Sequence, residues 1–464
     1  MKTFTYKISV LLLLAALGIT SCKVTKTYQQ PTTPVPSAYR SSETADTLSM
    51  AGMKWPSLFT DPVLQELIRA GLTANLDLKI AVQRINQSKA LFRKSKTAYL
   101  PDLKGNVGLK QSKLADPQGF GIFSSNTQYD FGISSNWELD IWGKLGSAKR
   151  AAMAELLASD AAKRAVQTQL IADIANHYYD LLALDEQLVV TRKTAINRGQ
   201  DAATIKLLFE NSILNGVAVV QSEANYYEAE LSIPDLEQQI REKENVLAVL
   251  LARNPGPIQR NSLAQQQLIY DLKPGIPAQL LAHRPDVQQA EYMFRAAFEN
   301  TNIASTQFYP GLNITAMGGF SSFSLKDWFS NGSLFGNIAG GIIQPIFNKG
   351  QNKAGLAIAL SQQQEALHVF ELSLLKASQE VSDALSAYQA AAQKEEKRSK
   401  QLKALTLAVE FNKELMNNSK NTNYTDVLAA EQNLLTAELK AINDQSQKLH
   451  AVVNLYRALG GGWN

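Results

Sequence analysis

Apolar residues recur at seven-residue steps over two long stretches of the chain. Between Gly350 and Thr422 the step is broken only at Glu395, and a companion series fills the second seam. The two series are Leu360, Leu367, Leu374, Val381, Tyr388, Leu402, Val409 and Met416, and Phe370, Ala377, Ala384, Ala391 and Leu405. This is the heptad pattern of a coiled coil.

The heptads continue beyond a short polar link around residues 417–425, at Leu428, Leu435, Ile442, Leu449 and Tyr456. Two helices joined in this way pair antiparallel, so residues 349–459 are predicted to form one coiled-coil helical pair. Residues 143–254 are predicted to form another, with helices at about 144–210 and 217–253. A helix of ~65 residues is on the order of 100 Å long. The alanine-rich seams fit a hollow assembly or a solid helical rod.

Four other segments alternate apolar and polar residues, which is typical of half-exposed β-strands. The clearest segment places Tyr129, Phe131, Ile133, Trp137, Leu139 and Ile141 on one face and Asp130, Ser134, Asn136, Glu138 and Asp140 on the other. Its expected partner is 103–110, and 312–321 and 335–347 are the third and fourth strands, the fourth with weaker alternation. We expect β-hairpins at 99–142 and 308–348, with apolar residues facing lipid and polar residues inward. The alternative is a water-soluble subdomain packed on the helices.

Four strands are too few to close a barrel, because the smallest transmembrane barrels have ~8 strands. Two copies would supply eight strands and an interior filled by side chains. Three copies would supply twelve strands and leave room for a channel. The strands therefore predict an oligomer and, by themselves, leave dimer and trimer open.

An internal repeat at a separation of roughly 208 residues organises these elements. Residues 219–231 match 427–439, with Val, Glu, Asn, Ala, Glu and Leu recurring in register. Upstream, 100–103 corresponds to 309–312, and 141–144 corresponds to 346–349. Each half reads helix, strand pair, very long helix, helix. This order adds helices at 62–98 and 278–307, a linker at 255–277 and a C-terminal tail at 460–464, and the fold class is mainly α with a β-barrel portion.

The N-terminus resembles a secretory signal that ends in a lipoprotein cleavage site. Lys2 and Lys7 precede an apolar run at 10–17, and Ile19-Thr20-Ser21 leads into Cys22, the only cysteine of the chain. We expect a signal peptide at 1–21, a covalent lipid such as palmitate on Cys22, and a Pro/Ser/Thr-rich extended tether at 22–61. The alternative is an ordinary signal peptide with a chance cysteine. Beyond residue 22 the sequence has no run of ~18 apolar residues, so any membrane-spanning part is expected to be β.

Composition and motifs exclude several classes of function. The 46 basic and 42 acidic residues are spread along the chain, without the cluster of cations that nucleic-acid binding requires. The four histidines, His177, His283, His368 and His450, have no metal-ligand spacing, and no nucleophile elbow or phosphate loop appears. We therefore expect no enzyme activity, no metal, and no cofactor other than the lipid.

A series of ordered motifs resembles the TolC-like outer-membrane efflux family, in its OprM/NodT-type lipoprotein branch. The resemblance covers essentially the whole mature chain. It rests on Trp55 with 58–62, on 137–145, on 280–287 with Ala290-Glu291, on 345–350, on 426–428 and on the terminal 455–463, with His283 where the family usually has arginine. It implies a homotrimer with a twelve-stranded barrel, a periplasmic α-helical barrel, a periplasmic adaptor protein and an inner-membrane pump of the RND type. Trp142 and Phe347 are expected in the aromatic girdle at the membrane interface, and Asp286 with Gln289 is expected to cap a helix.

The two turns between paired helices are the expected site of the periplasmic gate and of adaptor contact. The candidate residues are Asn211, Ser212, Asn215 and Gly216 in the first turn, and Lys420, Asn421, Asn423, Tyr424 and Asp426 in or after the second. Relatives usually carry glycine in these turns and an acid just after each; Asp426 matches one acid, and Ala218 stands where the other is expected. We expect polar contacts of Asn421, Asn423, Tyr424 and Asp426 to hold the tip closed; ordinary solvated turns are the alternative.

The sequence thus predicts a lipid-anchored exit channel of a tripartite efflux system. It would lie in the outer membrane of a Gram-negative bacterium, extend into the periplasm, and contact outer-membrane lipid but no nucleic acid. A type I secretion exit channel and a non-conducting, lipid-anchored coiled-coil scaffold are the alternatives. The sequence does not identify the transported substrate, the pump or the adaptor.

Overall fold

The computed structural model describes residues 24–31, 52–113, 125–266, 283–418 and 424–463. The chain divides into two units. Unit 1 comprises residues 1–32, 85–159 and 290–370, and unit 2 comprises residues 33–84, 160–289 and 371–464. Of the helices in the described residues, none is long and apolar enough to cross a membrane.

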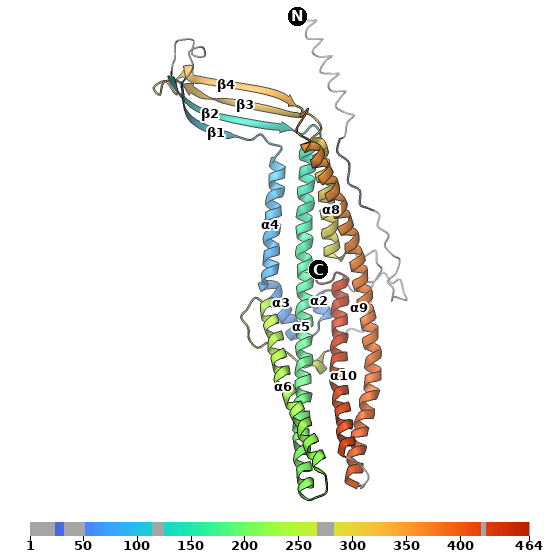
Figure 1. Cartoon of the computed structure of the whole chain (residues 1–464). Coiled ribbons are helices and arrows are strands. Elements are labelled where there is room, and N and C mark those ends of the chain that lie inside the picture. The colour runs from blue at the N-terminus through green and yellow to red at the C-terminus, as the bar shows by residue number, and fades with distance from the viewer. Residues whose placement is uncertain (1–23, 32–51, 114–124, 267–282, 419–423, 464) are drawn as a thin grey trace. The chain divides into compact units, whose positions relative to one another are not determined.

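Unit 1 contains an antiparallel sheet whose strands follow one another in chain order (Figure 1). The strands are β1 (Lys104–Lys113), β2 (Ser125–Leu139), β3 (Gly311–Ser322) and β4 (Leu334–Ile343). The central pair, β2 and β3, joins the two sequence repeats. The expected fourth strand at 335–347 ends earlier, before Gln344-Pro345, because proline has no N–H to donate to a neighbouring strand.

The strand register separates an apolar face of the sheet from a polar face. Val107 lies opposite Phe131, Phe131 opposite Phe320, and Phe320 opposite Leu334, which forms one apolar row across all four strands. On the other face, Asp130 lies opposite Ser321, and its Oδ1 accepts a hydrogen bond from the Ser321 hydroxyl at 2.6 Å. The predicted alternation is therefore present in three dimensions, and the outer edges of β1 and β4 have no strand beside them within the described residues.

The helical part of unit 1 is made of the ends of four helices. They are 85–97 of α4 (Leu76–Thr97), 144–159 of α5 (Lys144–Glu210), 290–306 of α8 (Pro285–Thr306) and 351–370 of α9 (Gln351–Asn418). Arg150 of α5 joins the buried Glu299 of α8 in a two-pronged ion pair, Nε to Oε1 at 2.7 Å and Nη2 to Oε2 at 2.9 Å. Charge-assisted pairs of this geometry fix the orientation of both side chains.

The segment 24–31 is bound to α8, although an extended tether was expected from 22 to 61. The backbone N–H and C=O of Lys26 bond to the Asn302 side chain at 2.9 and 3.0 Å. The Tyr28 ring packs edge-on against Phe294 and Phe298, with centroids 5.8 and 5.6 Å away. At the other end of the expected tether, α2 (Trp55–Leu58) forms a short helix with both end residues buried. Hydrogen bonds and aromatic packing therefore hold the first end of the expected tether, and buried apolar side chains hold the second end.

Unit 2 contains α3 (Pro62–Ala74), α6 (Gly216–Leu250), α10 (Tyr424–Ala458) and the remaining parts of α5 and α9. Within this unit α6 lies beside α5, and α10 lies beside α9 (Figure 1). The buried heptad residues of α9 include Leu374, Ala377 and Val381, as the seven-residue pattern predicted. The helix expected at 62–98 is instead two helices, because Asn75 leaves the helical conformation and its Oδ1 accepts from the Leu78 N–H, which starts α4.

The C-terminal glycines end α10 and close against the start of α8 within unit 2. Gly460 has φ +86°, and a Cβ there would come within 2.2 Å of the His283 carbonyl oxygen. Only glycine fits both the left-handed conformation and this approach. The indole N–H of Trp463 donates to the same His283 carbonyl at 3.0 Å.

Candidate functional site

The first candidate turn, at the tip of α5 and α6, ends α5 with a residue that is not glycine. Ser212 has φ +60°, its N–H bonds to the Phe209 carbonyl at 2.8 Å, and the Ile213 N–H bonds to the Leu208 carbonyl at 2.9 Å. This pair of bonds is a Schellman motif, in which glycine is the usual left-handed residue. The left-handed conformation of Ser212 is therefore about 1 kcal/mol less favourable than it would be for glycine at this position.

The other residues of the first turn satisfy backbone groups and remain exposed. Asn215 caps α6, because its Oδ1 accepts from the Ala218 N–H at 3.2 Å. The Asn211 amide donates to the Leu207 carbonyl at 2.8 Å, and Gly216 is the first residue of α6. In the structure these residues have the plain role of turn and cap.

The second candidate site is organised around an apolar core. Tyr424 begins α10 and is 4% exposed. Tyr424 belongs to a group of buried residues that we call the tip cluster: Ile205, Ala218, Tyr424, Val427 and Leu428. Leu214, Val219 and Met416 are partly buried and pack against the tip cluster. Residues from α5, α6, α9 and α10 meet here, so the two helical pairs are packed together at their tips.

Tyr424 contributes its ring to the tip cluster, whereas a polar contact was expected. Within the described residues its buried hydroxyl has no hydrogen-bond partner. Burial raises the pKa of Tyr424, and the nearby carboxyls of Asp201 and Glu431 raise it further. Asp426, on the same turn, is exposed. Lys420, Asn421 and Asn423 lie outside the described residues.

Charged residues lie next to the tip cluster, and no sequence pattern had identified them. We call Arg198, Asp201, Lys413 and Glu431 the tip ion cluster. Lys413 Nζ lies 2.6 Å from Glu431 Oε1. Burial, followed by the charge of Glu431, raises the pKa of Asp201, and one of its carboxylate oxygens is buried without a partner among the described residues.

Arg198 is the buried cation of the tip ion cluster. Its Nη1 donates to the Asn225 carbonyl of α6 at 2.8 Å, and its Nη2 donates to Gln432 of α10. One guanidinium therefore links three helices. A heptad analysis gives no signal for this role, because it identifies apolar seams rather than the polar positions between them.

The tip of the first helical pair exposes large apolar side chains to solvent. They are Leu207, Phe209, Ile213, Val217 and Val220. An apolar group of this size on a polar helical pair is typical of a surface that binds another protein. We call these five residues the first-tip apolar surface.

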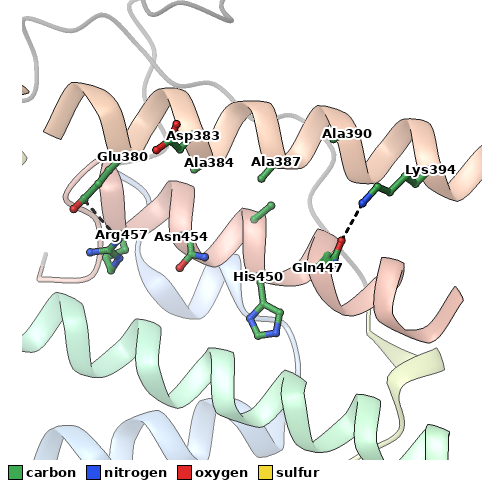
Figure 2. Close-up of a pocket in the computed structure, with 11 residues that line it drawn as sticks. Glu380, Asp383, Ala384, Ala387, Ala390, Lys394, Gln447, His450, Asn454 and Arg457 are labelled. Atoms are coloured by element: carbon green, nitrogen blue, oxygen red, sulfur yellow. Dashed lines mark hydrogen bonds and ion pairs between the residues drawn. The ribbon is translucent and has the colours of Figure 1, made fainter. Parts of the chain in front are cut away.

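A groove between α9 and α10 has small residues along it (Figure 2). Ala384, Ala387 and Ala390 line it, an ion pair of Glu380 with Arg457 at 3.5 Å lies at one end, and a hydrogen bond from Lys394 to Gln447 at 3.3 Å lies at the other. Of these three alanines, Ala384 belongs to the companion seam of the heptad pattern.

His450 forms a hydrogen-bonded network with residues of α5 where α5 and α10 pack together in unit 2. His450 points from α10 to α5, where its Nε2 lies 2.9 Å from Asp180 Oδ1 and its Nδ1 lies 2.7 Å from Asn176 Oδ1. Burial would raise the pKa of Asp180, but the nearby His177 ring and the hydrogen bonds with His450 and Lys243 hold it well below its usual value. No group of three or more His, Cys, Asp or Glu among the described residues is arranged to hold a metal ion.

The two predicted interface aromatics differ in their surroundings. The Trp142 N–H donates to the Pro310 carbonyl at 2.7 Å, and its ring lies 5.1 Å from that of Tyr309. Phe347 is 85% exposed. Cys22 lies outside the described residues, two positions before the segment that binds α8. Asp286 lies in the first turn of α8, where it accepts two hydrogen bonds from Arg284, at Oδ1 and Oδ2.

Comparisons with known proteins place these features in a family. The profile of the family described as outer membrane efflux protein matches residues 67–253 and 276–461. The solvent efflux pump outer membrane protein SrpC of Pseudomonas putida is 30% identical over 97% of both chains. The probable outer membrane lipoprotein SilC of Salmonella typhimurium is 28% identical over 94% of both. The crystal structure of the open state of the Neisseria gonorrhoeae MtrE outer membrane channel has a TM-score of 0.85, 25% identity, and covers 96% of this chain and 99% of its own. The chain therefore belongs to the outer membrane efflux protein family.

Proposed function

We propose that this outer-membrane efflux protein works as a trimer, in which three four-stranded sheets close one twelve-stranded barrel and the helices continue it as a periplasmic conduit. The observation that carries the proposal is the two-faced sheet with unpaired edge strands. Unpaired N–H and C=O groups at the edges of β1 and β4 are not tolerated in lipid, so neighbouring copies must pair with them. Three copies leave a polar, water-filled interior, whereas two would not.

The proposal is tested with the purified full-length protein. Mass photometry in detergent is expected to give three chains per particle, and proteoliposomes are expected to swell in a permeant sugar once the tips are opened. A protein that inserts into vesicles as a trimer but passes no solute would support the scaffold alternative. A dimer would remove the twelve-stranded barrel.

We propose further that the tip cluster is the closing element of the conduit. Its support is the convergence of four helices on a buried tyrosine, so that separating the helical pairs must expose these apolar residues. Truncating a buried aromatic costs about 3 kcal/mol, enough to shift a closed–open equilibrium about a hundredfold. Tyr424→Ala is expected to raise the closed-state conductance in planar bilayers, while Tyr227→Ala, an exposed tyrosine on α6, is the matched control. Equal conductances in the two variants would count against the tip cluster as the gate.

The exposed turn residues are weaker candidates for closing the conduit than the tip cluster is. Asp426 remains a candidate because it lies in the first turn of α10, beside the turn whose residues are outside the described part. An unchanged closed-state current in Asp426→Ala would remove it. Asn211, Ser212, Asn215 and Gly216 are proposed to shape the tip rather than to hold it closed.

The first-tip apolar surface is proposed to bind the periplasmic adaptor that connects the channel to an inner-membrane pump. Exposed Val217 and Val220 form part of a surface that gains about 25 cal/mol per Å² when an apolar partner covers it. The double variant Val217→Ser/Val220→Ser is expected to retain bilayer conductance but lose adaptor co-purification and efflux of a fluorescent dye. Retained efflux would place the adaptor elsewhere.

A lipid on Cys22 is proposed to anchor the chain, as the name of the SilC relative, a probable outer membrane lipoprotein, suggests for that protein. The segment 24–31 would then hold the anchored end at α8 through Lys26 and Tyr28. Cys22→Ser is expected to abolish labelling with radioactive palmitate; Lys23→Ser, an adjacent change that leaves the cysteine, should keep it. Label retained in Cys22→Ser would contradict the assignment.

A further inference from the structure

The turn between β3 and β4 returns two aromatic side chains to the sheet. The Trp328 ring lies 5.5 Å from that of Tyr129, and the Phe329 ring lies 6.0 Å from Phe131 and 5.5 Å from Phe320. Trp328 and Phe329 stack on each other with centroids 5.0 Å apart. We call these five residues the outer aromatic cluster. It belongs entirely to unit 1.

The strand register shows which face of the sheet carries this cluster. Phe131 and Phe320 lie opposite each other in the apolar row, so the turn packs on the apolar face. The polar network of Gln128, Asp130 and Ser321 belongs to the alternate positions, on the opposite face. If the polar face lines the barrel interior, as in the proposed function, the turn lies on the outer wall and does not cover the channel mouth.

In the proposed barrel, the position of the cluster within the sheet keeps it away from the edges where neighbouring copies would pair. Tyr129 and Phe131 belong to β2 and Phe320 to β3, the two central strands. Neighbouring copies would pair with the edges of β1 and β4 instead. The cluster therefore remains on the outside of the assembled barrel, continuous with the apolar wall that faces lipid.

The turn is crossed by two hydrogen bonds and exposes apolar groups beside Lys326 and Asp327. The Ser333 hydroxyl donates to the Asp327 carbonyl at 2.6 Å, and the Ser330 N–H donates to the same carbonyl at 3.1 Å. Phe329 is 62% exposed, and Phe323 and Leu325 of the same turn are exposed to a similar degree. The Trp328 N–H is buried without a hydrogen-bond partner among the described residues. Such a surface is unfavourable in water and favourable in hydrocarbon.

We propose that this turn is a lipid-contact element, which packs along the outer wall of the barrel and inserts Phe323, Leu325 and Phe329 beneath the headgroups of the outer leaflet. The occupant is the upper acyl-chain region of the membrane lipid. Aromatic side chains are favoured at this depth because they combine a large apolar surface with a polarisable ring. The inference rests on the proposed barrel, since it requires the apolar face to meet lipid.

Tryptophan fluorescence tests the element and the barrel separately. Trp137 lies on the same apolar face, opposite Ile314 and toward the other end of β2, so it reports whether the face meets lipid. The full-length protein is reconstituted in phosphatidylcholine vesicles with or without bromine at the 6 and 7 positions of one acyl chain. Wild type is compared with Trp328→Phe, Trp137→Phe and, as a control outside the sheet, Trp463→Phe.

Each of the first two substitutions is expected to remove roughly one third of the bromolipid-quenched emission, because Trp137, Trp142 and Trp328 would share it at the membrane interfaces. Trp463→Phe should leave the quenched emission unchanged. If Trp137 is quenched by bromolipid and Trp328 is quenched only by aqueous iodide, the lipid-contact element is overturned while the barrel stands. If neither is quenched by bromolipid, the proposed barrel itself fails.

A second variant tests the same element with Trp328 retained. Phe329→Ser removes the most exposed ring of the outer aromatic cluster and leaves the sequences of β2 and β3 unchanged. In bromolipid vesicles it is expected to lower the quenched emission by up to roughly one third, the share of Trp328. Asn331→Ser, in the same turn, is the matched polar control. Equal quenching in the two variants would contradict a role of the turn in lipid contact.

Discussion

The two helical pairs carry matching sequences, but an apolar position that is exposed at the tip of the first pair is buried at the tip of the second. In the repeat, Val220 of α6 corresponds to Leu428 of α10, and Gly216 corresponds to Tyr424. Val220 is 68% exposed, whereas Leu428 is 8% exposed. The difference follows from the first residue of each helix: Tyr424 packs against the tip cluster together with Leu428, and Gly216 has no side chain to do so. The repeated unit has thus diverged: the second pair buries this position in the tip cluster, whereas the first pair leaves it exposed.

Two helices that begin with proline within unit 2 are held by different side chains. Pro62 begins α3 and Pro285 begins α8, a position that suits proline because its missing N–H is not needed there. The residue before the first proline is the acid Asp61, which caps α3. The residue before the second is the base Arg284, which bonds to Asp286, Glu380 and the Ala458 carbonyl. Two helices that begin with proline are therefore fixed by side chains of opposite charge, although they do not occupy equivalent places in the repeat.

The largest effect is expected from Arg284→Met. Its removal leaves the carboxylates of Asp286 and Glu380 without their buried cation, and breaking a buried pair costs about 3–5 kcal/mol. Chemical denaturation followed by circular dichroism should show the loss. Arg192→Met is the matched control, because Arg192 pairs with Glu237 on the exposed surface, where an ion pair contributes at most about 1 kcal/mol. Similar losses in both variants would refute the distinction.

Asp61→Ala is expected to cost about 2–4 kcal/mol, because it removes a helix cap and the acceptor of one buried hydroxyl and two half-buried amides. The donors are the Tyr178 hydroxyl at 2.6 Å and the amides of Asn261 and Gln266, each at 2.8 Å. Burial would raise the pKa of Asp61, but these bonds and those from Val63 and Leu64 hold it below its usual value.

This lowered pKa fixes the sign of the pH dependence. An acid with a folded pKa below its unfolded value of about 4 stabilises the protein fully above that value, and the contribution is lost as the pH falls through the folded pKa. The stability difference between wild type and Asp61→Ala should therefore shrink below about pH 4. Denaturation midpoints at pH 7, 4 and 3 measure it; a difference that grows on acidification would contradict the bonded carboxylate.

The matched pair Leu428→Ser and Val220→Ser tests the contrast between the tips directly. The first change removes a buried side chain from the tip cluster and is expected to cost about 2–3 kcal/mol. The second alters an exposed residue and should stay within about 0.5 kcal/mol. Thermal unfolding and bilayer conductance are recorded for both. Comparable destabilisation would mean that the two tips are equally buried in the assembled protein.

The smallest effect is expected at the tip ion cluster. Burial and Glu431 raise the pKa of Asp201, while Lys413 lowers it, so the folded state binds the Asp201 proton more tightly than the unfolded chain. Stability should then fall as the pH rises from about 4 through the raised pKa. Asp201→Asn is expected to stabilise the protein by at most about 1 kcal/mol at pH 7 and to remove this dependence. Destabilisation by Asp201→Asn at pH 7 would show that the carboxylate is needed.

Much of the architecture could be predicted because its causes are local. Seven-residue steps identify coiled-coil seams, and Ala377 and Val381 are indeed fully buried. Two-residue alternation identifies strands with distinct faces, and Phe131 and Phe320 lie in one row. The break at Asn75 and the shorter β4 were missed, because a cap and a proline decide element ends more sharply than periodicity does.

The sequence by itself determined the repeat, the long helices, the two-faced strands and the candidate turns, since each is written in the spacing of neighbouring residues. The tertiary structure alone decided that Tyr424 is buried by residues from four helices, that Arg198 links α5, α6 and α10, and that Trp328 packs on the apolar face of the sheet. Periodicity shows which face of an element is apolar. It does not show what that face meets, because contacts between residues far apart in the chain are set by packing.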